Sequence, residues 1–235
     1  MHTLAARILD EMKAVATEDK RVRQSRFFKE PVNLLGLMTA EIKAVVKSHH
    51  ADVKHLRREQ VFELCEALMQ MGYWETVAAA TMFAYDVRRK FQKSDFKIFT
   101  TWQRKYITNW ANCDEFCNRT VNAIVEMYPE LVRDVKQWAK SKNRWMRRGA
   151  AVIFILSARR GRFLDTIFDI SDMLIHDTDE MVQKGYGWAL KEAGARAPER
   201  VYDYIAARRD IMPRKAFRYA IEKFTPHMRA AAMKL

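Results

Sequence analysis

Glycine and proline are scarce in this sequence, which has 7 glycines and 5 prolines among its 235 residues. Few turn-forming residues imply short connections, and the chain has few alternating β-branched runs of the kind that predict a sheet. Apolar residues make up 49% of the chain, so it can bury a sizeable core. Together these features predict an all-α protein.

Cysteine is also rare, and three residues are too few for a disulfide framework. Cys113 and Cys117 lie one helical turn apart, a spacing compatible with metal binding. No histidine or further cysteine stands at ligand spacing near them. We therefore expect buried thiols at Cys65, Cys113 and Cys117, with no metal and no cofactor.

Long apolar stretches are missing: no run reaches 18 residues, and the opening MHTLAARILDEMKAVATEDK is an amphipathic helical pattern without a signal peptide's apolar centre. Lysine and arginine number 42 against 29 acidic residues, a formal net charge of +13. Such a surplus favours a polyanionic partner, because neutralised phosphates release counterions. An anionic membrane is the rival partner, but neither end is strongly basic and amphipathic. We expect a cytoplasmic, nucleoid-associated monomer that binds nucleic acid and no membrane.

The sequence contains a repeat of about the length of two helices. The segments YWETVAAATMF, NWANCDEFCN, RWMRRGAAVIF and EMVQKGYGWAL align at Trp74, Trp110, Trp145 and Met181, which are 36, 35 and 36 residues apart. A period in the thirties is typical of α-solenoids. We predict one domain over residues 1–235, an α-solenoid of HEAT-like antiparallel helix pairs whose second helices line a concave, basic face.

Capping residues and prolines predict where individual helices begin. Thr39 is a candidate N-cap for a helix that follows the LLGLM segment. Further helix starts are expected at Asp95, Asn112, Pro129, Asn143, Asp177 or Asp179, Pro198 and Pro213.

Three groups of side chains that could take part in catalysis or binding fall on equivalent helices of successive repeats. Trp110 and Asp114 are four residues apart, so they share one face of a helix. Each group alone has an ordinary explanation, since tryptophans pack in cores and arginines cover solvated faces. Equivalent helices of a solenoid lie side by side, and we therefore expect these groups to meet in one groove. The second group is Trp188, which follows Gly187. The third group consists of the three arginines around Trp145, which are Arg144, Arg147 and Arg148.

Four segments resemble the AlkD-type DNA glycosylases of the DNA alkylation repair family, which are built from HEAT-like repeats. NWANCDEFCN is similar to the family's W-x-x-x-D segment, NRWMRRGAAVIF to N-x-W-x-x-R-A-A, and VQKGYGWALKE to Q-K-A-x-G-W-x-L-R-E. SRFFKEPVNLLGLMTAEIK is similar to the opening A-R-Y-M-K…F-x-G-[IV]-x-T-P-E-x-R element. The resemblance extends over roughly residues 20 to 225, and the ordered combination is more specific than any one segment.

The resemblance implies a DNA repair glycosylase that hydrolyses the N-glycosidic bond of cationic N3- or N7-alkylated purines in duplex DNA. In that family's pattern Asp114 is the catalytic carboxylate, and Trp110 and Trp188 form aromatic walls beside it. We then expect Trp74 and Trp145 to pack in the repeat core. The positions implied to contact the DNA backbone are Arg148, Thr39, Lys43 and Lys191.

The sequence departs from the family pattern at three positions. Phe27 stands where the family often has tyrosine, so any role of a hydroxyl there is lost. Gly149 and Gly185 replace alanine, which should loosen their helices slightly.

Two other functions stay open at this point. One is a catalytically inactive HEAT-like protein that binds bent or branched DNA, against which the presence of Trp110, Asp114, Arg148 and Trp188 argues. The other is a protein-interaction scaffold, the commonest role of α-solenoids, which has no need of a charge of +13.

Overall fold

A computed structural model describes residues 2–234 of the chain, and within that range it contains helices and no strand. The prediction of an all-α protein is therefore confirmed. None of the helices in the described range is long and apolar enough to cross a membrane. The chain forms two compact units, Met1–Phe116 and Cys117–Leu235.

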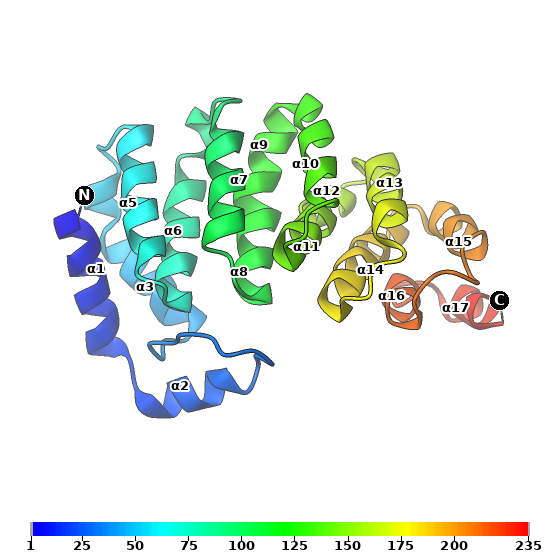
Figure 1. Ribbon diagram of the computed structural model, residues 1–235, viewed down its shortest axis with the longest axis horizontal. Coiled ribbons are helices and arrows are strands. Elements are labelled where there is room, and N and C mark those ends of the chain that lie inside the picture. Colours follow the sequence, from blue (N-terminus) through cyan, green and yellow to red (C-terminus); the bar gives the residue numbers. More distant parts are fainter. Residues whose placement is uncertain (1, 235) are drawn as a thin grey trace. The chain divides into compact units, whose positions relative to one another are not determined.

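The first unit contains the blue to green helices of Figure 1. Its helices are α1 (His2–Val15), α2 (Glu18–Ser25), α3 (Thr39–Ser48), α4 (His50–Val53), α5 (Arg58–Gln70), α6 (Trp74–Asp86), the 3₁₀ turn η1 (Arg88–Lys90), α7 (Asp95–Lys105) and α8 (Trp110–Glu115).

A π-helical turn, η2 (Phe116–Val121), follows α8 directly, and the second unit continues from it. The helices of that unit are α9 (Asn122–Met127), the 3₁₀ turn η3 (Pro129–Leu131), α10 (Val132–Trp138), α11 (Arg144–Val152), α12 (Ile155–Ala158), α13 (Leu164–Leu174), α14 (Glu180–Gly194), α15 (Pro198–Ala206), α16 (Arg214–Ala220) and α17 (Pro226–Met233).

Each unit is built from pairs of neighbouring helices, as the pair α5 and α6 illustrates (Figure 1). Helix α5 buries Val61, Leu64 and Leu68, which recur at helical spacing and form one apolar face. Helix α6 is buried around most of its circumference, and the small side chains of its Ala78–Ala80 stretch allow its neighbours to approach closely. The connection between the two helices is three residues long, consistent with the scarcity of turn residues in the sequence.

The predicted repeat coincides with the starts of four helices. Trp74 and Trp110 are the first residues of α6 and α8, and Trp145 and Met181 are the second residues of α11 and α14. These four are the second helices of their pairs, so the period of 35 to 36 residues corresponds to one helix pair. The repeat is therefore confirmed.

Side-chain caps fix three of these four starts. The Asn109 carboxamide oxygen accepts from the Asn112 N–H at 2.9 Å, and that of Asn143 accepts from the Trp145 N–H at 2.8 Å. Asp179 caps α14 in the same way, at 2.8 Å from the Met181 N–H. The caps at Asn143 and Asp179 confirm two predicted starts, whereas the start predicted at Asn112 is wrong because Asn109 takes the cap three residues earlier.

The N-terminal helices also differ from the prediction. Thr39 is the first residue of α3 rather than its N-cap; Met38 is the cap residue, and its N–H donates to the Glu41 carboxylate at 2.8 Å. The helix expected over the first twenty residues ends at Val15. Thr17 starts a new helix by accepting a hydrogen bond from the backbone of Lys20, which breaks the pattern into α1 and α2.

A buried carboxylate holds the extended segment between α2 and α3. Glu75, at the start of α6, is fully buried and accepts hydrogen bonds from the N–H groups of Leu35, Gly36 and Leu37 at 2.9, 2.7 and 3.2 Å. Gly36 has φ +106°, and a Cβ there would lie 2.4 Å from the Thr17 carbonyl oxygen, so the close approach requires glycine. The segment is thus fixed across the start of α6.

We expect Glu75→Gln to lower the free energy of unfolding by about 2 kcal/mol, because the amide NH₂ would face backbone donors and leave one of them unsatisfied. Urea unfolding followed by circular dichroism measures this change. Glu63→Gln, on the exposed side of α5, is the matched control and should leave the midpoint unchanged. Equal midpoints for the two variants would show that the Glu75 contacts do not stabilise the fold.

Candidate functional site

Trp110 belongs to an aromatic cluster at the start of α8. Its indole Nε1 donates to the Phe27 carbonyl oxygen at 3.3 Å. The Phe28 ring lies 5.9 Å from the Trp110 ring, and 6.5 Å from the Trp74 ring in an edge-on arrangement. Phe28 therefore joins the tryptophans of two successive repeats, and Trp74, which we had assigned to the repeat core, is only partly buried.

Phe27 and Phe28 face different environments although they are adjacent. Phe28 packs into the cluster, whereas the Phe27 side chain is 69% exposed. The backbone N–H and carbonyl oxygen of Phe27 are both hydrogen-bonded, to Gln24 and Trp110. A large aromatic ring that is exposed on such a fixed backbone is typical of binding surfaces. From the sequence, Phe27 was identified only as a position that lacks the family's tyrosine hydroxyl, and Phe28 was not identified at all. The adjacent pair of phenylalanines in SRFFKE was the signal that could have indicated both.

Asp114 lies one turn after Trp110 on α8, as the spacing predicted. Cys113 and Asn112 point into the core, where the Gln103 amide of α7 contacts the Cys113 sulfur at 3.4 Å. Trp110 and Asp114 occupy the less buried side of the helix. Because the π-helical turn η2 begins two residues after Asp114, the helix widens directly beside this carboxylate, and such turns are frequent at functional sites.

Thr39 and Lys43 lie one turn apart at the start of α3, and both are exposed. The opposite face of α3 buries Ile42, Val45 and Val46. The exposed face therefore offers a hydroxyl and an ammonium group together, which suits a phosphate.

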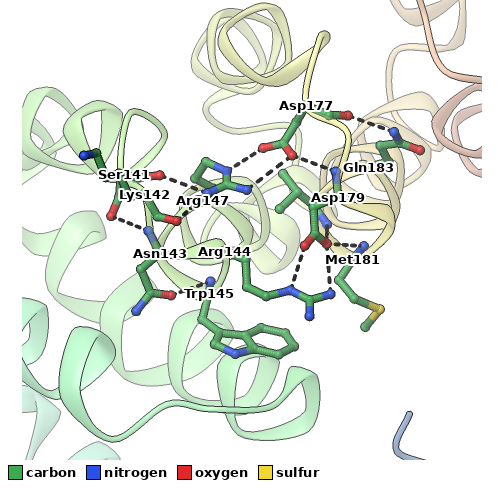
Figure 2. A network of polar contacts seen from close by, with 11 residues as sticks. Ser141, Lys142, Asn143, Arg144, Trp145, Arg147, Asp177, Asp179, Met181 and Gln183 are labelled. Carbon is green, nitrogen blue, oxygen red and sulfur yellow. Dashed lines mark hydrogen bonds and ion pairs between the residues drawn. The ribbon is translucent and has the colours of Figure 1, made fainter. Parts of the chain in front are cut away.

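Two of the three arginines around Trp145 are tied to acidic residues within the second unit (Figure 2). Arg147 pairs with Asp177, with its Nε 2.5 Å from a carboxylate oxygen, and it also donates to two backbone carbonyl groups. Arg144 pairs with Asp179 at 2.7 Å, the same carboxylate that caps α14. These pairs join the start of α11 to the connection between α13 and α14, so both arginines stabilise the packing of two repeats.

Arg148 is buried in the same junction, with 5% of its surface exposed. Its guanidinium donates to the Met181 carbonyl oxygen, and its side chain passes beside Gly185. Arg148 therefore holds α11 against α14. Its expected contact with a DNA phosphate stays a prediction. Trp145, beside these arginines, is buried at 7% exposure and confirms its assignment to the core.

Trp188 on α14 is partly buried and anchored by a carboxylate. Its Nε1 donates to Glu192 at 3.2 Å, and Glu192 in turn binds Arg159 at 3.0 Å and Lys223 at 2.6 Å. Burial opposes ionisation of Glu192, but the hydrogen bonds from Lys223 and Arg159 outweigh it and hold the pKa below its ordinary value. The indole edge is thus bound to a carboxylate that is charged at neutral pH. Lys191, expected to contact phosphate, forms an ion pair with Glu222 at 2.6 Å.

The predicted site residues are divided between the two units. The first unit brings Trp110 and Asp114 together on α8 and Thr39 and Lys43 together on α3. The second unit contains Arg148, Trp188 and Lys191. That all of them line one groove stays a prediction from the repeat. The three cysteines are buried, as expected, and no group of metal-ligating side chains occurs in residues 2–234.

Comparisons with known proteins agree with this architecture. A family model described as DNA alkylation repair enzyme matches residues 8–224, a range that runs through both units. A solved structure described as a predicted DNA alkylation repair enzyme from Enterococcus faecalis has a TM-score of 0.81 and 16% sequence identity, covering 90% of this chain and 97% of that chain. At this identity the likeness concerns the fold. No curated protein matches the sequence.

Two glycines of α14 should respond in opposite ways to alanine. A Cβ at Gly185 would lie 3.4 Å from the Arg148 side chain, an ordinary contact, so Gly185→Ala should raise the free energy of unfolding by about 0.5–1 kcal/mol through helix propensity. A Cβ at Gly187 would lie 2.8 Å from the Ala216 carbonyl oxygen of α16, so Gly187→Ala should lower it by about 1–3 kcal/mol. Urea unfolding compares the two variants, and destabilisation by both would contradict the space inferred at Gly185.

Proposed function

The chain belongs to the DNA alkylation repair enzyme family, and we propose on this premise that it is a DNA glycosylase acting on cationic N3- or N7-alkylated purines in duplex DNA. The observation that carries the proposal is the placement of Trp110 and Asp114 one turn apart on the less buried side of α8. The resemblance of NWANCDEFCN to the family's W-x-x-x-D segment supports the same pair.

The chemistry requires little from the protein because the substrate is already activated. Alkylation of a ring nitrogen makes the purine a cation, so it leaves with the electron pair of the C1′–N bond as a neutral base. A second carboxylic acid to protonate the leaving group, as most sugar hydrolases use, is then not obligatory. Water adds to C1′ and gives up a proton, leaving an abasic deoxyribose.

In this mechanism Asp114 acts on the sugar. As the bond breaks, positive charge develops on the deoxyribose, and an ionised carboxylate stabilises that charge more than it stabilises the ground state. The same carboxylate orients the attacking water and accepts its proton. The Trp110 ring adds cation–π attraction and excludes competing water. Trp188 is proposed as a second aromatic wall on the strength of its family segment.

The DNA backbone is proposed to bind at the exposed face of α3 through Thr39 and Lys43. Phe27, exposed on the segment that precedes α3, offers a further, apolar surface within the same unit. For the two other proposed contacts the structure sets conditions: Lys191 has to exchange its ion pair with Glu222 for a phosphate. Arg148, of whose surface only 5% is exposed, has to move toward the strand to contact it. Phosphate contacts carry no sequence information, so we expect the enzyme to read damage and not sequence.

Asp114→Asn tests the catalytic carboxylate. We expect the release of 7-methylguanine from methylated duplex DNA to fall roughly hundredfold or more, because the charge that stabilises the sugar cation is lost while shape is kept. Liquid chromatography of the released base gives the rate, and gel shift should show duplex binding unchanged.

Glu115→Gln is the control for this experiment, since it removes a neighbouring carboxylate from a different side of the same helix. It should retain the rate of the unmodified protein. Equal rates for the two variants would exclude Asp114 as the catalyst. An unmodified chain that binds the duplex and releases no base would contradict the glycosylase assignment itself.

Lys43→Ala tests the backbone contact. Loss of one phosphate contact should weaken duplex binding uniformly across sequences and reduce the slope of log affinity against log salt by about one. Lys97→Ala is the charge-matched control, because Lys97 is exposed on α7, the first helix of its pair. Fluorescence anisotropy at several salt concentrations measures both slopes. A Lys43→Ala slope equal to that of Lys97→Ala would remove α3 from the interface.

A further inference from the structure

A cavity of about 170 Å³, open to solvent, lies at the C-terminal end of the second unit. It is formed by α16, by α17 and by the connection that leads from α15 into α16; Figure 1 shows these helices in orange and red. Seven residues line it: Arg209, Met212, Arg214, Phe217, Arg218, Ala232 and Met233.

One face of α16 supplies the centre of this cavity. Phe217 and Arg218 stand three and four residues after Arg214, the spacings that place side chains on one side of a helix. The opposite side of α16 is used for packing, since Ala216 approaches Gly187 of α14 so closely that a Cβ at Gly187 would overlap it. The fold therefore holds the face that lines the cavity in a fixed position.

Within the part of the chain that the structure describes, no acidic group neutralises the charge of the cavity. Its lining includes three arginines and no acidic side chain. Within residues 2–234 no carboxylate forms an ion pair with any of these three, whereas Arg208, next in sequence to Arg209, is paired with Asp172. Guanidinium groups gathered without a counter-charge repel one another, and a bound anion relieves that repulsion.

The other lining residues are apolar. Phe217, Met212 and Met233 are large, and Met233 is 48% exposed although it borders a cavity. Methionine side chains adapt their shape to an apolar ligand group. A sugar-phosphate backbone carries anions but no apolar side group to fill such a space, whereas a peptide carries both.

We propose that this cavity binds an acidic segment of a partner protein, with carboxylates at the arginines and one large apolar side chain against Phe217 and the methionines. The lining includes none of the residues proposed for catalysis, and the proposal gives the protein a docking function in addition to base release. Charge complementarity provides the attraction, and the apolar pocket provides the selectivity for peptide over phosphate.

The test uses the full chain and a fluorescein-labelled peptide of sequence DEDDLFDE, with binding followed by anisotropy at about 50 mM salt. We expect the double variant R214A/R218A to bind about tenfold more weakly than the unmodified protein, and Phe217→Ala to weaken binding by a similar factor. The peptides NQNNLFNQ and DEDDSSDE, which lack the charge or the apolar group, should bind more weakly than the parent peptide. Arg229→Ala, on α17 but outside the lining, is the charge-matched control and should bind normally.

The arginine variants change exposed side chains and should fold normally, which circular dichroism verifies even if Phe217→Ala is unstable. Equal affinity of R214A/R218A and Arg229→Ala for the peptide would overturn the proposal, as would equal binding of NQNNLFNQ. A duplex DNA that loses affinity with R214A/R218A while DEDDLFDE does not bind would make the cavity a DNA contact instead and also overturn it. Base release by R214A/R218A should stay normal. A negative result in the peptide experiment would therefore overturn the docking proposal and leave the glycosylase assignment untouched.

Discussion

The start of the second helix in each pair is the constraint on which the arrangement of functional side chains depends. At Asn109, Asn143 and Asp179 a side-chain oxygen binds backbone N–H groups that would otherwise be unsatisfied, and this fixes the residue at which the helix begins. A shift by one residue would rotate every later side chain by about 100° around the helix axis. Trp110 and Asp114 share a face because they are four residues apart, and the cap at Asn109 fixes the direction in which that face points.

The same caps explain why much of the fold could be predicted from the sequence. The repeat positions are the first or second residues after the cap residues, so Trp74, Trp110, Trp145 and Met181 marked the four helix starts correctly. The assignment of Trp145 to the core was also correct. Asn112 was mistaken for a cap because asparagine stands at both 109 and 112, and only the three-dimensional hydrogen bond distinguishes them.

Features that depend on contacts between distant residues could not be predicted. Nothing local marks Glu75 as the partner of a segment about forty residues earlier, or Phe28 as the link between two tryptophans. The π-helical turn after Asp114 has no sequence pattern of its own. The arginine-rich sequence RWMRRG indicated a binding surface, yet its first two arginines are paired and Arg148 is buried. Most of the candidate site on α8 was thus predictable, whereas its surroundings were not.

The basic residues of the chain include some that are paired with carboxylates and others that stay exposed. Part of the excess of basic residues is neutralised locally, as the pairs of Arg144, Arg147 and Lys191 show. The formal charge of +13 therefore overstates what a ligand meets near these residues. The cations that stay exposed, such as Lys43 and the three arginines of the C-terminal cavity, are the ones that we propose to contact ligands.

The segment that carries Phe27 is held at both ends, by Trp110 at the Phe27 carbonyl and by Glu75 at Leu35–Leu37. A ring presented from such a segment has lost most of its backbone conformational entropy before any ligand arrives. Binding at Phe27 then costs less ordering than binding at a flexible loop, and more of the contact energy is available as affinity. In the interface that we propose, the hydrogen bonds of Glu75, far from the exposed ring in sequence, would therefore contribute to binding at Phe27.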